Sequence, residues 1–351
     1  MSNWKVIKTK IEVFDHPNAD KLQLAKVGTY QVVVQRGLYE GGEEVVFAPE
    51  KSMLTGKLEE EYKPYLSGPD KNRVSSIRLR NELSCGIIIP PDLIEAQTGR
   101  TIDSLPYEED LSVILGISKY VPKIPKEMEE LATPIDHDTL SSQHEVEQFG
   151  VYSSNFIENE RVVLSEKLHG TQLTFYAQIK KSGIANDWLS TKNYNSQGLC
   201  LIESDDSFYW KALRAANVRE IIVNEFAPAD DSEIVVQIFS EAFPYFGFTY
   251  NQTSPTLRIF KVVIDGESIP YDKVPDSIKE FWVPILYDGP YDDILNIKKL
   301  VKGMEQVSGK ETNIKEGGVL IPYIERRAKD GTRLVVKILN PKYKETGEEF
   351  N

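Results

Sequence analysis

Short apolar runs alternate with clusters of turn residues along the first hundred residues. Runs such as KVIKTKIEVF, YQVVVQRG and CGIIIP are separated by Gly, Pro, Asn and Asp, and no long helical period interrupts them. This rhythm is typical of the short strands of a small barrel or sandwich. We therefore predict an all-β module over residues 1–105.

The pattern changes twice further along the chain. Residues 106–150 are rich in Pro, Glu, Asp and Ser, which favours a linker with short helices. From residue 151 onward, strand-like segments such as RVVLSEKL, TQLTFYAQI and RLVVKIL mix with two apolar stripes of helical period that begin at Ser207 and Ile294. We predict that residues 151–351 form an α+β domain built on antiparallel sheets.

The length, net charge and residue counts of the chain narrow the class of protein. The chain has 351 residues, a formal net charge of -13, two cysteines and four histidines. This length allows two domains, and the few cysteines and histidines give neither a disulfide framework nor a zinc spacing. The N-terminus lacks a signal-peptide apolar region, and no run is long enough to cross a bilayer. We expect a cytoplasmic protein without a membrane partner, in which carboxylates hold any metal.

An acidic net charge argues against nucleic-acid binding, because phosphate contacts need Lys and Arg. Dissolved salt screens the net charge of the whole protein beyond short distances, so a locally basic surface can still bind phosphates. The stretch KNRVSSIRLR contains no acid, which makes Lys71, Arg78 and Arg80 weak candidates for nucleic-acid contacts. An edge strand that carries solvated arginines explains the same stretch equally well.

One lysine has an unusual position. Lys-x-x-Gly occurs at Lys167, Lys180, Lys315 and Lys344, but only Lys167 ends one apolar run and precedes another. Strand alternation places its amine on one face of a sheet, and Gly170 supplies a turn where a backbone can approach a ligand closely. A lysine acts as a nucleophile at neutral pH when burial or a second cation lowers its pKa, so a neighbouring cation is expected.

Other charged residues follow or precede strands. In RLVVKIL we predict that Arg333, Val335 and Lys337 share one face, although a snorkelling Lys337 would give the same pattern. Glu241 follows EIVVQIF, and Glu316 leads into GVLIP. Each acid alone is consistent with an ordinary strand end. Two carboxylates that converge on a lysine and a triphosphate would supply the sparse oxygen ligands that Mg²⁺ prefers.

The order of these segments resembles the covalent nucleotidyltransferases, which include RNA ligases, DNA ligases and mRNA capping enzymes. In this resemblance EKLHGT carries the nucleophile Lys167, with Glu166 and Gly170 beside it at the nucleotide. LSTKNYNSQGL places Lys192 near the nucleotide, and LRIFKVVI places the ring of Phe260 on adenine. IFSEAF, KEGGVLIP and LVVKIL supply the catalytic residues Glu241, Glu316 and Lys337. Six segments in the right order are far more specific than a lone motif.

The N-terminal half narrows the resemblance. FDHPNADKLQLAKVG resembles OB-fold modules of the tRNA-binding type, and DLSVILGISKYVPKIP resembles ATP-dependent RNA ligases of the Deinococcus type. Such a resemblance implies an OB-like barrel ahead of an adenylyltransferase domain. It also implies the use of ATP with Mg²⁺ or Mn²⁺, a lysyl-AMP intermediate and the sealing of RNA 3′-OH ends to 5′-phosphates. The expected partner is RNA, including nicked duplexes with RNA or DNA strands, and the expected state is a monomer.

Three positions depart from the family pattern. Ser240 replaces a glycine, Gln172 replaces an asparagine, and Val335 replaces a first lysine two residues before Lys337, which predicts a cleft with one basic charge fewer. Two alternatives stay open. One is another covalent nucleotidyltransferase, a DNA ligase or capping guanylyltransferase, which the short chain after Lys337 disfavours. The other is a non-catalytic RNA-binding adaptor. His169 receives no role.

Overall fold

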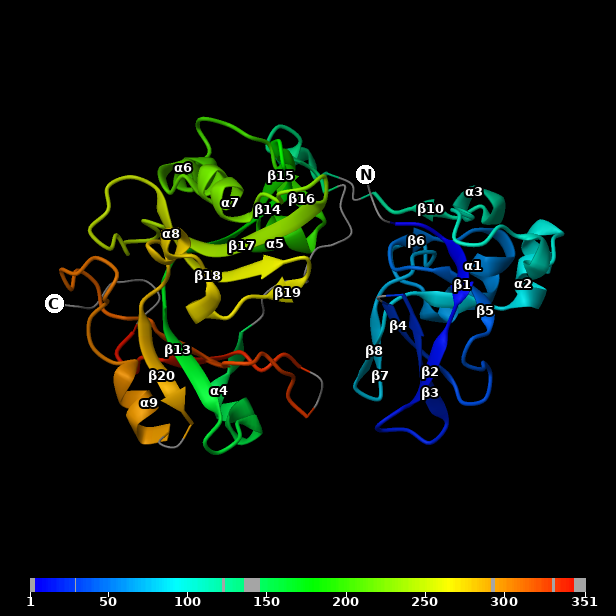
Figure 1. Ribbon diagram of the computed structural model, residues 1–351, viewed down its shortest axis with the longest axis horizontal. Coiled ribbons are helices and arrows are strands. Elements are labelled where there is room, and N and C mark those ends of the chain that lie inside the picture. Colours follow the sequence, from blue (N-terminus) through cyan, green and yellow to red (C-terminus); the bar gives the residue numbers. More distant parts are fainter. Residues whose placement is uncertain are drawn as a thin grey trace. The chain divides into compact units, whose positions relative to one another are not determined.

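A computed structural model describes residues 4–28, 30–121, 124–135, 146–291, 294–329 and 332–343. The chain forms two compact units, and the first ends at Val121 (Figure 1). This boundary falls inside the segment 106–150, of which residues 136–145 lie outside the described part. Helix α3 (Ser112–Leu115) belongs to the first unit, because Leu111, Leu115 and Ile117 are buried in its core.

The first unit is built from short strands, as predicted. They pair in four small sheets: β1 (Ile7–Lys10), β5 (Glu44–Ala48) and β9 (Ile87–Ile89); β2 (Glu12–Asp15), β3 (Leu22–Val27) and β4 (Tyr30–Gln35); β6 (Ser52–Met53) and β10 (Ser118–Lys119); β7 (Ile77–Leu79) and β8 (Glu82–Ser84). Strand hydrogen bonds close no barrel among these described residues. Helices α1 (Gly56–Tyr62) and α2 (Pro91–Thr98) were not predicted, because each is too short to repeat an apolar period and buries one side chain, Leu58 or Ile94.

The second unit contains two sheets, which confirms the prediction of antiparallel sheets. The seven-stranded sheet has the order β11-β16-β15-β14-β17-β18-β19 and is antiparallel throughout. Its strands are β11 (Ala132–Pro134), β14 (Thr171–Lys180), β15 (Gly183–Thr191), β16 (Leu199–Leu201), β17 (Glu233–Phe243), β18 (Thr256–Ile264) and β19 (Glu267–Ser268).

The five-stranded sheet has the order β12-β22-β21-β13-β20, in which only the β12–β22 pair is parallel. Its strands are β12 (Glu147–Gln148), β13 (Arg161–Lys167), β20 (Ile285–Pro290), β21 (Gly317–Pro322) and β22 (Val336–Leu339). Strands β14 to β19 come between β13 and β20 in the chain. The chain therefore leaves this sheet at Lys167 and returns at Ile285. The two crossings touch, since the N–H of Glu166 donates to the carbonyl of Pro284 at 2.8 Å.

Helices cover one face of each sheet. Helices α6 (Phe208–Ala215) and α7 (Val218–Phe226) pack on the seven-stranded sheet, where Trp210 and Leu213 join its core (Figure 1). Helices α4 (Phe149–Tyr152) and α9 (Ile294–Leu300) pack on the five-stranded sheet. The two remaining helices are α5 (Lys192–Ser196) and α8 (Asp276–Lys279). None of the helices in the described residues is long and apolar enough to cross a membrane.

Candidate active site

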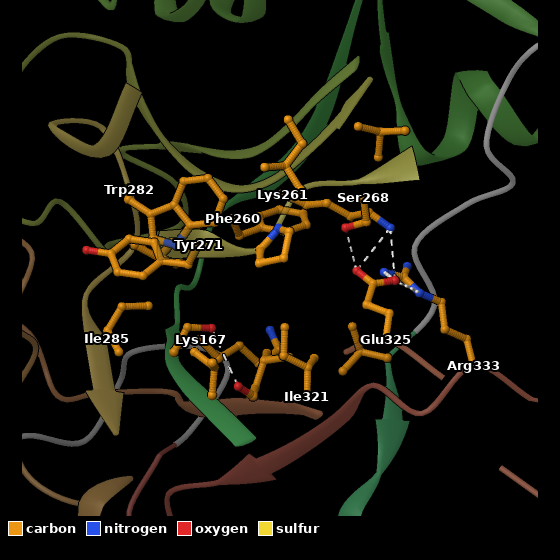
Figure 2. Close-up of a pocket in the computed structure, with 18 of the residues that line it drawn as sticks. Lys167, Phe260, Lys261, Ser268, Tyr271, Trp282, Ile285, Ile321, Glu325 and Arg333 are labelled. Carbon is orange, nitrogen blue, oxygen red and sulfur yellow. Dashed lines mark hydrogen bonds and ion pairs between the residues drawn. The ribbon is translucent and has the colours of Figure 1, made fainter. Parts of the chain in front are cut away.

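The other faces of the two sheets line a cavity of about 800 Å³. Val163, Ser165 and Lys167 of β13 line it, whereas Val162 and Leu164 are buried in the core beneath α9. Strand alternation therefore gives Lys167 the face that the sequence predicts. In Figure 2, Lys167 and Ile321 lie on one side of the cavity, and Phe260 and Trp282 lie on the other.

Lys167 is paired with a carboxylate. Its Nζ lies 2.6 Å from Oε1 of Glu316, and the lysine side chain is about a quarter exposed. Glu316 directly precedes β21, and Lys167 is the strand partner of Gly317, so the backbone places the two side chains together. At Gly318 a Cβ atom would lie 2.8 Å from Leu164. The glycines of KEGGVLIP therefore allow β21 to pack closely on β13.

Glu241 is the second acid of the site. It lies inside β17 rather than after the strand, because pairing with β14 continues to Ala242. A Cβ atom on Gly170 would lie 2.6 Å from the carbonyl of Ala242 and 2.7 Å from Cγ of Glu241, so glycine is required for this close approach. Burial raises the pKa of Glu241 to about 7, while the amines of Lys167 and Lys192 act to lower it.

Glu316 also raises the pKa of Glu241. The structure therefore brings together Lys167, Lys192, Glu241 and Glu316, which are far apart in the sequence. Lys192 begins helix α5, whose N-terminus is capped by the side chain of Thr191. Lys167, Lys192 and Glu241 line one end of the cavity and Glu316 contacts Lys167 from beside it, and two acids with two lysines can hold a phosphate chain and a divalent cation together.

A β-bulge shapes the aromatic wall of the cavity. Phe239 pairs with Lys261 and Ser240 pairs with Ile259, which leaves Phe260 as the extra residue of β18. Such a bulge changes the direction of side chains, and both Phe260 and Lys261 line the cavity (Figure 2). Trp282 and Tyr271 line it as well, with ring centroids 5.4 Å apart. A planar base fits between this aromatic wall and the aliphatic side chains of β13 and β21.

Lys337 also lines the cavity, on the same sheet face as Lys167, because it pairs with Val319, which in turn pairs with Ser165. The prediction that Val335 shares this face is wrong. Strand β22 begins at Val336, and the N–H of Val335 donates to the carbonyl of Arg333 in a turn. Val335 is 1% exposed and does not line the cavity, whereas Arg333 does.

Sequence reasoning missed a charged cluster at the end of the cavity opposite Lys167 (Figure 2). Glu325 accepts hydrogen bonds from Arg333 Nε at 2.9 Å and from Ser268 Oγ at 2.7 Å, and it forms an ion pair with Lys261 at 3.5 Å. Burial and then Arg333 lower the pKa of Lys261 to about 8. We predicted a cleft with one basic charge fewer, because Val335 replaces a lysine. Arg333 and Lys261 instead add two basic groups to the cavity.

Glu166 is among the residues that line the cavity, and its carboxyl group also anchors a loop. Glu166 is 2% exposed and accepts a hydrogen bond from the N–H of Gln306 at 3.0 Å, while its buried Oε1 has no hydrogen-bond partner in the part of the chain that the structure describes. Burial raises the pKa of Glu166 to about 7. Its carboxylate therefore fixes the loop that carries Gln306 behind the strand.

Two of the departures from the family pattern lie beside Glu241. Gln172 of β14 is its strand partner and lines the cavity. Ser240 is fully buried, and its hydroxyl finds no hydrogen-bond partner among the described residues.

The basic candidates of the first unit lie on an exposed hairpin and a nearby turn. Arg78 is in β7 and donates to the carbonyl of Asn81 at 3.1 Å, while Arg80 and Asn81 have positive φ angles in the two-residue turn to β8. Lys71 also has a positive φ, of 52°. All three basic side chains are exposed.

A metal would need ligands from outside the protein. The described residues contain no group of three or more His, Cys, Asp or Glu side chains that could hold a metal ion. Glu241 and Glu316 supply two carboxylates, which suits Mg²⁺ or Mn²⁺ only if phosphate oxygens and water complete the coordination shell. The donor set fits a metal that arrives with a nucleotide.

A lysine, two carboxylates and an aromatic cavity between two antiparallel sheets define a candidate nucleotidyl-transfer site. A sequence model of the RNA ligase family matches residues 160–339, just over half of the chain. The chain belongs to the RNA ligase family.

Solved structures of an RNA ligase from Naegleria gruberi are similar to the chain. The structure with PPi is 16% identical over 97% of each chain, with a TM-score of 0.43. Two mutants with AMP and Mn are each 17% identical over 96% of each chain, with TM-scores of 0.43 and 0.44. No curated protein matches the chain.

Proposed function

We propose that this RNA ligase uses ATP and forms a covalent lysyl-AMP intermediate on Lys167. The observation that carries the proposal is the pairing of Lys167 with Glu316 at 2.6 Å, beside Glu241, in a cavity with an aromatic wall. An amine so placed can meet the α-phosphorus of a nucleotide whose base lies on Phe260. The resemblance of EKLHGT to the nucleophile motif and this geometry both support Lys167 as the reacting group.

In the first step the amine of Lys167 forms a P–N bond to the α-phosphorus, pyrophosphate leaves and the amine gives up a proton. Transfer of this kind requires mainly positioning and neutralisation of charge. Lys337 and Lys192 line the cavity and supply positive charge. Mg²⁺ or Mn²⁺ bound by Glu241 and Glu316 would neutralise phosphate charge. Phe260 holds the base by stacking, and Glu166 and Gly170 position the strand end that carries the nucleophile.

In the later steps AMP moves to a 5′-phosphate, and a 3′-OH RNA end displaces it. We assign RNA binding to the module 1–105, with Lys71, Arg78 and Arg80 as phosphate contacts. The linker predicted over residues 106–150 is restricted to the connection between the units, because Leu111, Leu115 and Ile117 pack in the first unit and β11 and β12 belong to the sheets of the second. We assign adenylation to residues 151–351 together with β11 and β12. An OB-like origin of the module, relationship to the Deinococcus type, action on nicked duplexes, a monomeric state and a cytoplasmic location belong to the same proposal.

Covalent labelling tests the proposal. The purified protein is incubated with α-labelled ATP or GTP, with Mg²⁺, with Mn²⁺ and with a chelator. We expect covalent label from ATP that survives denaturation and alkali, is released by acid as a P–N bond requires, depends on the metal and is lost in Lys167→Ala. Label from GTP would favour a capping guanylyltransferase, and joining of DNA rather than RNA ends would favour a DNA ligase. Absence of label from the wild-type protein would favour the non-catalytic adaptor.

A further inference from the structure

A second cavity, of about 850 Å³, meets the first at the nucleophile. Lys167, Leu168 and Glu241 line both cavities. The other residues of the second cavity are His169, Gly170, Tyr245, Phe246, Gly247, Glu316 and Tyr343. A phosphorus atom bonded to Lys167 therefore lies where a group from either cavity can reach it.

An aromatic loop, residues 245–248, forms one wall of the second cavity. Backbone hydrogen bonds between Tyr245 and Phe248, of 3.1 and 2.9 Å, close a tight turn with Phe246 and Gly247 at its tip. Phe246 is 71% exposed and has a φ of 41°. A positive φ is rare for a bulky side chain, and such strain is found most often at ligand sites. Phe246 therefore has an unfavourable backbone conformation, and its large apolar ring is exposed to solvent.

Neighbouring rings hold this loop in place. The centroids of Tyr245 and Phe246 are 4.3 Å apart. His169 stacks on Phe248 at 4.2 Å, and its Nδ1 lies 2.5 Å from the hydroxyl of Tyr343. Because these contacts fix the base of the loop, Phe246 projects from a rigid support.

The charges of the second cavity indicate which part of a substrate it accepts. Its charged lining consists of one lysine, Lys167, against Glu241 and Glu316. These charged groups lie only around the reacting lysine, where a single phosphate is needed, whereas the aromatic wall farther from it favours a flat uncharged group. Nucleobases stack on aromatic side chains whatever their sequence. An RNA end offers such a group directly beside its reactive phosphate.

We propose that the aromatic loop stacks on the base of the RNA nucleotide that carries the 5′-phosphate. The inference rests on the proposed function. With AMP on Lys167 and its base in the first cavity, the second cavity offers the RNA a route to the same lysine. An oxygen of its 5′-phosphate then forms a P–O bond to the AMP phosphorus while the P–N bond to Lys167 breaks, and the amine takes up a proton. Stacking on Phe246 holds that phosphate in reach.

The test compares RNA ends with and without a base. Protein that has first been adenylated is mixed with RNA whose 5′-phosphorylated terminal nucleotide is either intact or abasic, and AMP transfer is timed over a range of RNA concentrations. We expect the wild-type protein to prefer the intact end by about 5- to 150-fold in apparent KM, the range for stacking of one base. Phe246→Ala should lose this preference, and Phe246→Trp should keep it.

Two controls accompany these variants. Lys167 labelling by ATP reports folding of the catalytic unit and should be equal in all of them. Ile157→Ala removes another exposed apolar side chain, 60% exposed, that lines neither cavity, and it should keep the full preference for the intact end.

An equal preference in the wild type and Phe246→Ala would overturn the inference. A preference that instead depends on the base at the 3′-OH end would also overturn it. A wild-type protein that takes no label would contradict the proposed function itself, which is a separate result.

Discussion

Gly170→Ala provides a sharp test of the site, because one methyl group would press on the backbone that carries Glu241. The new Cβ would lie 2.6 Å from the carbonyl of Ala242 and 2.7 Å from Cγ of Glu241, where ordinary contacts begin near 3.4 Å. Strand β17 or the turn at residue 170 must therefore move by about 0.7 Å or more. The φ of Gly170 is not in the left-handed region, so crowding is the sole cause.

Two effects of this crowding can be measured. Overpacking of this kind costs about 1–3 kcal/mol of folding free energy. A misplacement approaching ~1 Å can lower a rate by ~100-fold, so we expect lysine adenylation to fall by about 10- to 100-fold. Urea unfolding reports the first effect, and the single-turnover rate of labelling from ATP reports the second.

Gly150→Ala is the matched control. Gly150 lies in helix α4, and a Cβ there has no heavy atom within 4 Å. Alanine in a helix should leave adenylation unchanged and stabilise the protein by about 0.5–1 kcal/mol. If Gly170→Ala adenylates as fast as Gly150→Ala and unfolds at the same urea concentration, the close approach of residue 170 to β17 does not constrain the site.

Two further predictions follow from burial and stacking. Burial raises the pKa of Glu166 from 4.5 to about 7. Relative to the unfolded chain, this shift costs no folding free energy below pH 4.5, increasingly more between pH 4.5 and 7, and about 3 kcal/mol above pH 7. Glu166→Gln should therefore stabilise the protein at pH 8 and scarcely at pH 4.5, as urea unfolding at both values would show; equal gains at both would contradict the assigned cause. Phe260→Ala should raise the KM for ATP in adenylation by about 5- to 150-fold, and an unchanged KM would exclude stacking of the base on this ring.

Sequence patterns predicted the residues that alternate along regular strands. The period of two in β13 placed Lys167 on the correct face, and the apolar stripe from Ser207 predicted helix α6. The same reasoning failed at Val335, because the chain turns at Arg333 and alternation begins only at Val336. The alternation of side chains along a strand can be extrapolated only as far as the backbone stays in the extended conformation.

Contacts between distant segments could not be predicted from the sequence. Glu325 meets Lys261 at a sequence separation of 64 residues, and no local pattern in either segment indicates that they share a cavity. Phe260 was predicted from a motif, but the bulge that directs its ring could not be read from LRIFKVVI, because strand register is set by the partner strand. The small sheets of the first unit were predicted as strands, while their arrangement depends on long-range pairing.

Two of the crossings between the sheets lie side by side next to the reacting lysine, while a third connects β11 to β12. The chain leaves the five-stranded sheet just after Lys167 and re-enters it just after Pro284, whose carbonyl is held by Glu166. If one sheet rotates against the other, its pivot runs through these adjacent connections. Displacement grows with distance from a pivot, so opening of the cleft would break the contacts of Glu325 with Lys261 and Ser268 at its mouth while the reacting amine stays almost still. The enzyme could thus admit and release nucleotides without disturbing the atom that performs the chemistry.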